Sequence, residues 1–211
     1  MRLADEFFLI AWDTAGQGKP VLHPQGAALG LAGALLGELI LGERLTVQGA
    51  GLLVLNRVPV EDPLARDVLA QIVAAPEHTD VRTWLAYLAQ DAAEGVGARL
   101  QDAGLVQRVE SRVLFRTRVR YEATEFAKGA WPSLRLTMLL SEHQPMSLPD
   151  MLLAALVDAA GLLDHVLFEP EQRAPAREYL TTLTAALPPA LRGLAGHVSA
   201  AVGSAVMTYR T

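Results

Sequence analysis

The stretch GAALGLAGALLGELILGERL, residues 26–45, is the segment around which we expect the chain to fold. Its uncharged part ends before Glu38 and is too short to span a bilayer, which needs about 20 apolar residues. Glycines four residues apart let a neighbouring helix approach closely, and two such pairs occur here: Gly26/Gly30 and Gly33/Gly37. We therefore predict a buried central helix rather than a membrane span.

Helix signals continue beyond this stretch, so we predict a mainly α fold. Pro63 begins a helix with Asp62 as its cap, and Asp80 caps the next helix. A third helix runs from about residue 92 and ends at Gly104, a residue that favours helix ends. Apolar periodicity predicts further helices over residues 134–141, 147–168, 173–187 and 190–209.

One segment between the predicted helices indicates a small β-hairpin. Residues 43–59 alternate loosely and carry Gly49 and Gly51 in the middle, which is typical of a small hairpin. Residues 4–12 are a short apolar element of uncertain type, and residues 123–133 look irregular. We expect a single globular helical domain over residues 1–211, with a central buried helix and one or two β-hairpins.

Composition narrows the classes of function. The chain is 51% hydrophobic and 19% charged, which supports one large core and excludes wholesale disorder. It has no cysteine, so disulfides, thiolate catalysis and Cys-based metal sites are excluded, and we expect no metal and no cofactor. The N-terminus lacks the basic start of a secretory signal, so we expect a cytoplasmic protein. The abundance of Arg, Ala, Gly and Leu resembles the usage of a high-GC bacterium.

The block RVESRVLFRTRVRYE, residues 108–122, concentrates five of the eighteen Lys and Arg of a chain whose net charge is −5. Read as one strand over residues 112–121, it packs Val, Thr and aromatic residues on one face. The other face would present guanidinium groups to phosphate-bearing surfaces, namely those of Arg112, Arg116, Arg118 and Arg120. Leu114 or Phe115 would add modest membrane insertion. Alternatively, the arginines blunt an edge strand or pair with acids of residues 141–172, which contain no Lys or Arg.

Catalytic motifs are missing. The five histidines are scattered, and no HExxH, GxSxG, GxGxxG or Walker pattern occurs, so we predict no catalytic residues and no enzyme. The three tryptophans are expected to be packing anchors: Trp12, Trp84 and Trp131. Residues 84–124 resemble a winged-helix DNA-binding module, but its recognition helix carries three acids against Arg99. Phosphates would repel such a helix, so nucleic acid is an unfavoured partner.

The order of motifs along nearly the whole chain resembles the Golgi phosphoprotein 3 family, also called the GPP34 domain, which has many bacterial members. The residues that carry the resemblance are LADEFFLIAWD (3–13), LGLAGALLGELILGERL (29–45), DPLARDVL (62–69), the WLAYLA helix, RLQDAGLV (99–106) with its hairpin, and PDMLLAALVDAAGLLDHVLF (149–168). The resemblance implies a mostly helical domain with one projecting hairpin.

The same resemblance implies a non-catalytic peripheral membrane adaptor. Eukaryotic members recognise phosphatidylinositol 4-phosphate and bind the tails of glycosyltransferases, and their hairpin is associated with membrane contact and self-association. The family's lipid pocket uses a tryptophan and three basic residues, whose positions fall at His23, Ala32, Gln90 and Ala93; none keeps the family's residue. The expected anion- or lipid-binding residues are Arg112, Arg116, Arg118, Arg120 and His23.

We therefore expect a cytoplasmic, membrane-associated adaptor whose arginine-rich hairpin binds anionic phospholipid headgroups. Protein tails and a second copy of the chain are further candidate partners. The alternatives are a self-associating scaffold, in which the hairpin meets the acidic region of another copy, and a winged-helix-like DNA-binding regulator.

Overall fold

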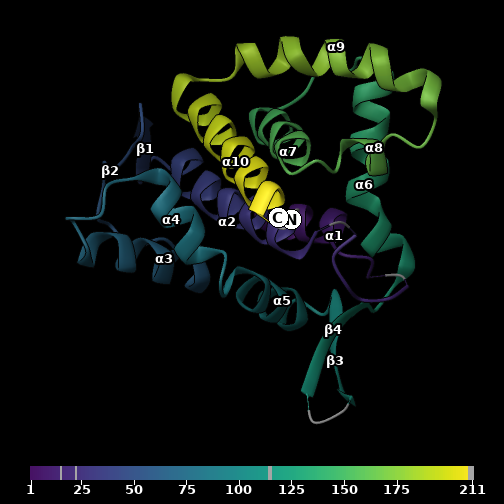
Figure 1. The fold of residues 1–211 in the computed structure, drawn as a ribbon, viewed down its shortest axis with the longest axis horizontal. Helices are drawn as coiled ribbons and strands as arrows, with labels where there is room; N and C mark the ends of the chain where they lie inside the picture. Colours follow the sequence, from purple (N-terminus) through teal and green to yellow (C-terminus); the bar gives the residue numbers. More distant parts are fainter. Residues whose placement is uncertain (15, 22, 114–115, 209–211) are drawn as a thin grey trace.

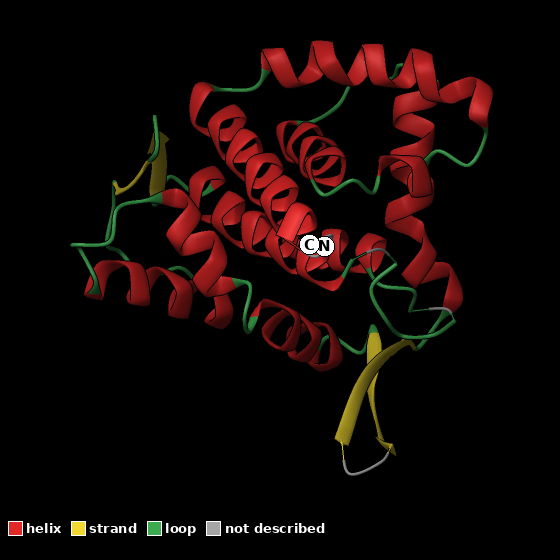
Figure 2. Cartoon of the chain, viewed as in Figure 1, coloured by secondary structure: helices red, strands yellow, loops and turns green. Residues whose placement is uncertain are grey.

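The computed structural model describes residues 1–211 apart from 15, 22, 114–115 and 209–211, and of residues 111–113, 116–118 and 206–208 it describes the backbone but not the side chains. In that part of the chain, ten helices and two antiparallel hairpins form a mainly α fold (Figures 1 and 2). The helices are α1 (Leu3–Ala11), α2 (Pro24–Leu41), α3 (Pro63–Ala74), α4 (Val81–Leu88), α5 (Ala92–Asp102), α6 (Phe126–Ser141), α7 (Leu148–Ala159), α8 (Leu163–Val166), α9 (Pro170–Ala186) and α10 (Pro189–Thr208). The strands are β1 (Leu45–Gln48), β2 (Gly51–Val54), β3 (Val106–Val113) and β4 (Arg116–Ala123).

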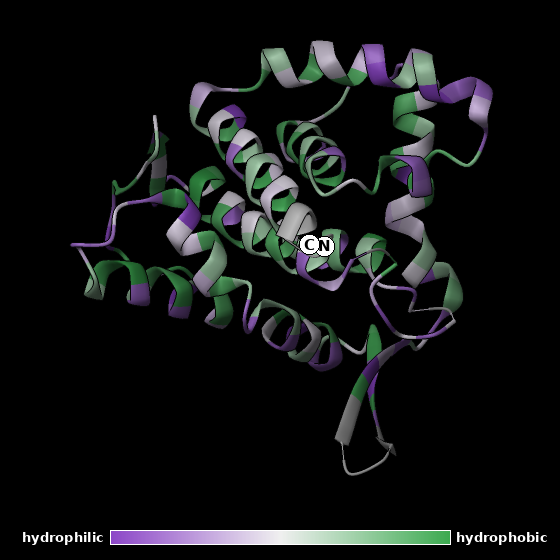
Figure 3. Ribbon diagram, viewed as in Figure 1, coloured by the Kyte–Doolittle hydropathy of each residue, from purple (hydrophilic) through white to green (hydrophobic). Residues whose placement is uncertain are grey.

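Helix α2 lies at the centre and is covered by α1, α7 and α10 (Figure 1). A Cβ on Gly30 would lie 2.2 Å from Cζ of Phe7 in α1, and one on Gly33 would lie 2.5 Å from Cγ2 of Val198 in α10. The predicted close approach of helices at these glycines is confirmed. Among the described residues, α2 is the one helix long and apolar enough to cross a membrane, and 72% of it is buried inside the fold. Figure 3 shows green and pale residues along most of the central helices.

Four helices meet at one buried guanidinium. Arg99 of α5 donates from Nε to Oδ1 of Asp5 in α1 at 2.8 Å, and from Nη1 to Oδ2 of Asp62, the N-cap of α3, at 2.8 Å. Both of its terminal nitrogens also donate to the carboxylate of Glu38 in α2 at 3.1 Å. Burial raises the pKa of Glu38, although Arg99 opposes that shift. The carboxylates raise the pKa of Arg99 above its ordinary value against the effect of burial.

Several sequence predictions are confirmed. The Asp62 carboxylate accepts from the backbone N of Ala65 at 2.9 Å, and the Asp80 carboxylate accepts from the backbone N of Thr83 at 2.8 Å, so both caps are present. The first hairpin is β1–β2, whose turn contains Gly49 at φ +58°. The apolar element near the N-terminus is helix α1.

The segment from residue 123 to 133 is not irregular as predicted, because α6 begins at Phe126 and runs without a break to Ser141. Gly129 and Pro132 are both buried packing positions inside this helix. A Cβ on Gly129 would lie 2.8 Å from Cβ of Ala123 in β4, so glycine here lets α6 start directly against the hairpin.

The prediction of one helix over residues 147–168 is also wrong. Helix α7 ends at Ala159, and Gly161 follows at φ +76°, a left-handed conformation that glycine adopts without strain. The chain then forms the single turn α8 before it enters α9.

The prediction of a single strand over residues 112–121 is wrong as well. The block contains the ends of two antiparallel strands, β3 and β4, in which Arg112 pairs with Thr117 and Val113 with Arg116. Paired positions share a face of a hairpin, so Arg112 belongs to the face of Thr117, and Arg116, Arg118 and Arg120 belong to the opposite one. The projecting hairpin that the family resemblance implied is present as β3–β4. Leu114 and Phe115, the residues expected to insert into a membrane, lie outside the described residues.

Candidate functional site

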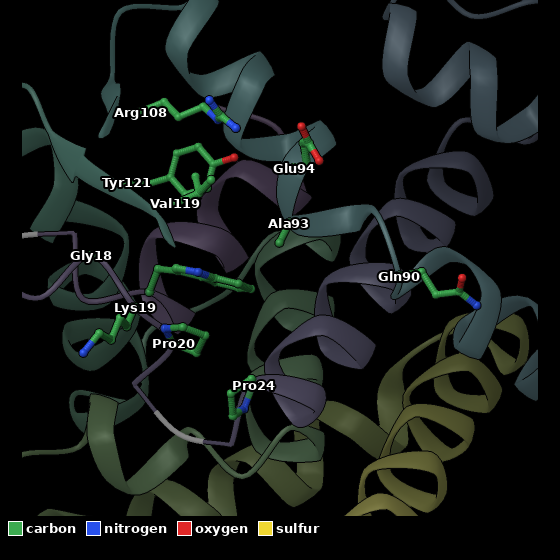
Figure 4. A pocket seen from close by; sticks show the side chains of 11 residues that line it. Gly18, Lys19, Pro20, Pro24, Gln90, Ala93, Glu94, Arg108, Val119 and Tyr121 are labelled. Atoms are coloured by element: carbon green, nitrogen blue, oxygen red, sulfur yellow. The ribbon is translucent and has the colours of Figure 1, made fainter. Parts of the chain in front are cut away.

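The candidate site is a pocket at the base of the β3–β4 hairpin, which projects from the helical body between α5 and the start of α6 (Figure 1). Its volume is about 430 Å³. Figure 4 shows Arg108 and Tyr121 from the hairpin across from Ala93 and Glu94, with Lys19 and Pro20 on the adjoining loop. The lining residues are Trp12, Gly18, Lys19, Pro20, Pro24, Gln90, Ala93, Glu94, Arg108, Val119 and Tyr121.

Backbone hydrogen bonds fix the loop between α1 and α2 against the hairpin. The backbone N of Ala123 donates to the carbonyl O of Thr14 at 2.8 Å, and the backbone N of Tyr121 donates to that of Gly18 at 3.4 Å. Gly18 has φ +62°, and a Cβ there would lie 2.8 Å from Cβ of Arg120. A glycine is required at this position because the loop lies directly on β4.

Three aromatic side chains pack against one another beside the pocket: Phe8, Trp12 and Tyr121. Phe8 stacks on Trp12 with ring centroids 4.4 Å apart, and Tyr121 meets Phe8 edge-on at 5.3 Å. A Cβ on Gly97 would lie 2.3 Å from Cζ of Tyr121, so the tyrosine ring fits only because α5 has a glycine there. Burial raises the pKa of the Tyr121 hydroxyl, which stays neutral and available for hydrogen bonding.

The charges at the pocket are mixed. Lys19 and Arg108 supply two cations, and Glu94 supplies one anion. Lys19 Nζ donates to Oε1 of Gln17 at 3.3 Å, and the Arg108 guanidinium is paired with the exposed carboxylate of Glu110. Exposed ion pairs of this kind contribute little to stability, so a doubly charged anion can compete for Arg108.

The predicted site residues are distributed around this pocket. His23 is the N-cap of α2 and directly precedes Pro24, which lines the pocket, but His23 is not itself a lining residue. Arg120 was predicted to face open solvent, but it is half-buried over the Gly18 loop. Its Nε is buried and has no hydrogen-bond partner in the described part of the chain. The side chains of Arg112, Arg116 and Arg118 lie outside the description, and their roles remain predictions.

The sequence reasoning did not select Lys19 and Arg108. Arg108 opens the arginine block, and its place in β3 opposite Tyr121 could have been found by splitting the block into two strands. Lys19 is one of two lysines in the chain and lies in a loop rich in Gly and Pro. Gln90 and Ala93, at positions where the family has basic residues, do line the pocket, whereas Ala32 is fully buried.

Three of the six acidic residues between 141 and 172 bind arginines that lie outside the hairpin. Asp150 pairs with Arg135. Asp158 lies 3.7 Å from Arg177, and Asp164 accepts from the same guanidinium at 2.7 Å. These pairs leave less carboxylate charge for the hairpin of another copy, which weakens the alternative of a self-associating scaffold.

Two other kinds of site find little support. The exposed residues of α5, the would-be recognition helix, include Glu94 and Asp102, while its single cation, Arg99, is directed into the core. A helix of this charge does not favour a DNA groove. Over the described residues, no group of three or more His, Asp or Glu side chains is arranged to hold a metal ion.

These features define a class of protein: a helical scaffold that carries a small mixed-charge pocket at the base of a projecting, arginine-rich hairpin. The model of the family Golgi phosphoprotein 3 (GPP34) matches residues 3–203. The chain therefore belongs to the Golgi phosphoprotein 3 family. No curated protein matches the sequence significantly.

Proposed function

We propose that this protein is a non-catalytic, peripheral membrane adaptor that binds anionic phospholipid headgroups through its β3–β4 hairpin and the pocket at the hairpin base. The observation that carries the proposal is the projection of the hairpin, with five arginines between residues 108 and 120, from a body whose net charge is negative. Family membership supports it, since eukaryotic members are lipid-binding adaptors. A protein tail is a second ligand that such an adaptor would hold.

The binding energy is expected to come mainly from charge. Each Lys or Arg near an anionic bilayer contributes about 1 kcal/mol, and the attraction weakens within a Debye length of about 8 Å at physiological salt. At the positions of the family's tryptophan and arginine this chain has His23 and Ala32. The cations that line its pocket are Lys19 and Arg108. We therefore expect little discrimination between headgroups of equal charge.

Vesicle sedimentation tests the proposal. The native protein should bind vesicles of phosphatidylcholine and phosphatidylglycerol at low salt, and not vesicles of phosphatidylcholine alone. Changing Arg116, Arg118 and Arg120 together to Glu should reduce the affinity at least about 100-fold, since three attractive charges are lost. Equal binding by this variant, or no binding by the native protein, would refute the proposal.

A matched control separates the hairpin from net charge. Arg57, in the loop after β2, Arg66 of α3 and Arg82 of α4 are exposed and lie on elements other than the hairpin. Changing these three to Glu alters the net charge by the same amount and should leave most of the affinity intact. Vesicles that contain phosphatidylinositol 4-phosphate, matched in total charge, test whether the pocket selects that headgroup.

A further inference from the structure

Helix α6 has an exposed face that is almost entirely apolar. Six of its residues are exposed: Phe126, Ala127, Lys128, Trp131, Leu134 and Met138. Five are apolar, and one is a lysine. Phe126 is 72% exposed, Trp131 52% and Met138 49%, so about half or more of each of these residues contacts solvent. We call these six residues the α6 face.

The α6 face is unlike an ordinary solvated helix surface. A surface helix normally places apolar residues toward the core and polar residues outward. In α6 the inward side is apolar too, since Leu136 and Leu140 are fully buried. Trp131, Leu134 and Met138 follow one another at spacings of three and four residues, so they form one continuous stripe along the helix. An exposed stripe of this kind marks an interaction site.

The stripe itself carries little net charge, so its attraction to an anionic surface would come from the neighbouring hairpin. Lys128 is the one charged residue on the α6 face, and it lies beside the stripe. Glu125, the N-cap of α6, accepts from Lys128 Nζ at 2.7 Å, so the nearest carboxylate is already paired. Two residues, Thr124 and Glu125, separate α6 from β4. The start of α6 also packs on the hairpin, since a Cβ on Gly129 would lie 2.8 Å from Cβ of Ala123 in β4.

We propose that the α6 face enters the interfacial layer of the same anionic bilayer whose headgroups the hairpin binds. Helices that lie in a membrane surface combine Trp, Phe and Leu on one side with Lys or Arg beside them, and tryptophan is enriched at the depth of the headgroups. The α6 face has this composition. The inference rests on the proposed function, because the hairpin supplies the attraction that brings α6 to the bilayer.

Trp131 makes the inference measurable in the unmodified protein. Trp12 and Trp84 are only 6% and 5% exposed, so Trp131 is the tryptophan that acyl chains would contact. Trp12 lines the headgroup pocket, so the Trp131→Phe variant reports its separate response. Vesicles of phosphatidylcholine and phosphatidylglycerol with brominated acyl chains should quench Trp131 and shift its emission to the blue. The same vesicles should leave the emission of a Trp131→Phe variant unquenched.

A pair of variants tests the contribution of the stripe. Leu134→Gln with Met138→Gln should weaken vesicle binding about tenfold or more, because two apolar side chains no longer leave water. The matched control is Thr181→Gln with Thr182→Gln, two exposed positions of α9, which should change nothing. All four positions are exposed, so folding is retained in both variants.

The outcomes separate the two proposals. Binding with quenching of Trp131 supports both. Binding without quenching, and with full affinity in the Gln variants, overturns the role of α6 and leaves the hairpin proposal intact. No binding by the native protein overturns both. A lipid-free dimer that Leu134→Gln with Met138→Gln dissociates would assign the α6 face to a second copy instead, and would overturn the membrane inference.

Discussion

The arginines of this protein fall into two groups that differ in what surrounds them. Arg99 and Arg135 lie inside clusters of carboxylates that join separate helices, with side chains only 13% and 23% exposed. The hairpin carries five arginines over residues 108–120 with one acid, Glu110, among them. The first group is neutralised by the fold, whereas the second is left with excess positive charge. The same residue type thus holds helices together in one region and, we propose, recruits the protein to a surface in another.

The largest expected effect of a single change is at Arg99. Its replacement by Met leaves Asp5, Glu38 and Asp62 buried next to one another without a cation. Removing one partner of a buried ion pair typically costs about 3–5 kcal/mol, so the free energy of unfolding should fall by that amount. Urea denaturation followed by circular dichroism measures it. A loss below about 1 kcal/mol would mean that the cluster is not a structural centre.

Arg135 should have a smaller effect of the same kind. It pairs with Glu6 of α1 and Asp150 of α7, so its replacement by Met removes the ion pairs that join α6 to both helices. The site is less buried than that of Arg99, and water can solvate the remaining carboxylates. We expect a loss of about 1–3 kcal/mol in the same urea experiment. A cost equal to that of Arg99→Met would contradict the ranking by burial.

The two carboxylates that bind Arg135 should respond to pH in opposite directions. Burial raises the pKa of Asp150, but hydrogen bonds from Ser147 and Arg135 outweigh it and hold the value below 3.8. The stability that Asp150 contributes is therefore present above its ordinary pKa and lost as pH falls through the lowered one. Burial raises the pKa of Glu6 above 4.5, so its contribution is complete below that value and lost as pH rises.

Variants at these two carboxylates test the signs. The stability penalty of Asp150→Asn should be larger at about pH 7 than at about pH 3. Relative to the native protein, Glu6→Gln should gain stability as the pH rises from about 4 to about 7. Urea midpoints at three pH values measure both. Parallel pH profiles for the two variants would show that the hydrogen bonds with Ser147 do not set Asp150 apart from Glu6.

The smallest effect on stability should come from the hairpin. Arg118→Gln should change the free energy of unfolding by less than about 0.5 kcal/mol, as is usual for surface substitutions away from buried networks. The same change should lower the affinity for anionic vesicles about fivefold, because one cation near a bilayer contributes about 1 kcal/mol. Arg118→Lys keeps the charge and should keep the affinity. A destabilisation similar to that of Arg135→Met would place Arg118 in the first group.

The fold was predictable because the most informative motifs converge on one point. Asp5 lies in LADEFFLIAWD, Glu38 in ELILGERL, Asp62 in DPLARDVL and Arg99 in RLQDAGLV. Each motif thus contributes one member of the buried cluster, and together they specify how four helices meet. The motifs that reveal the family therefore describe its architecture. They say little about the ligand, which depends on loop and hairpin residues outside them.

The candidate site was predicted only in part, for physical reasons. A run of alternating residues looks the same whether it forms one strand or two paired strands, so the pattern alone put Arg112 on the face of Arg116, Arg118 and Arg120. The hairpin was indicated only by the family resemblance. Lys19 reaches the pocket through a loop whose path is fixed by backbone bonds to β4, which no periodicity reveals. Trp131 was expected to be a packing anchor, but it is 52% exposed on a helix that the apolar pattern did not reveal.

The packing of α10 on α2 has a consequence for the chain while the ribosome is still synthesising it. Val198 of α10 occupies the space that Gly33 leaves open, and α2 emerges from the ribosome long before α10 does. Until then the central helix exposes an apolar surface suited to another helix. A nascent chain stalled ahead of residue 189 should therefore recruit chaperones, and release of the last helix should end that recruitment.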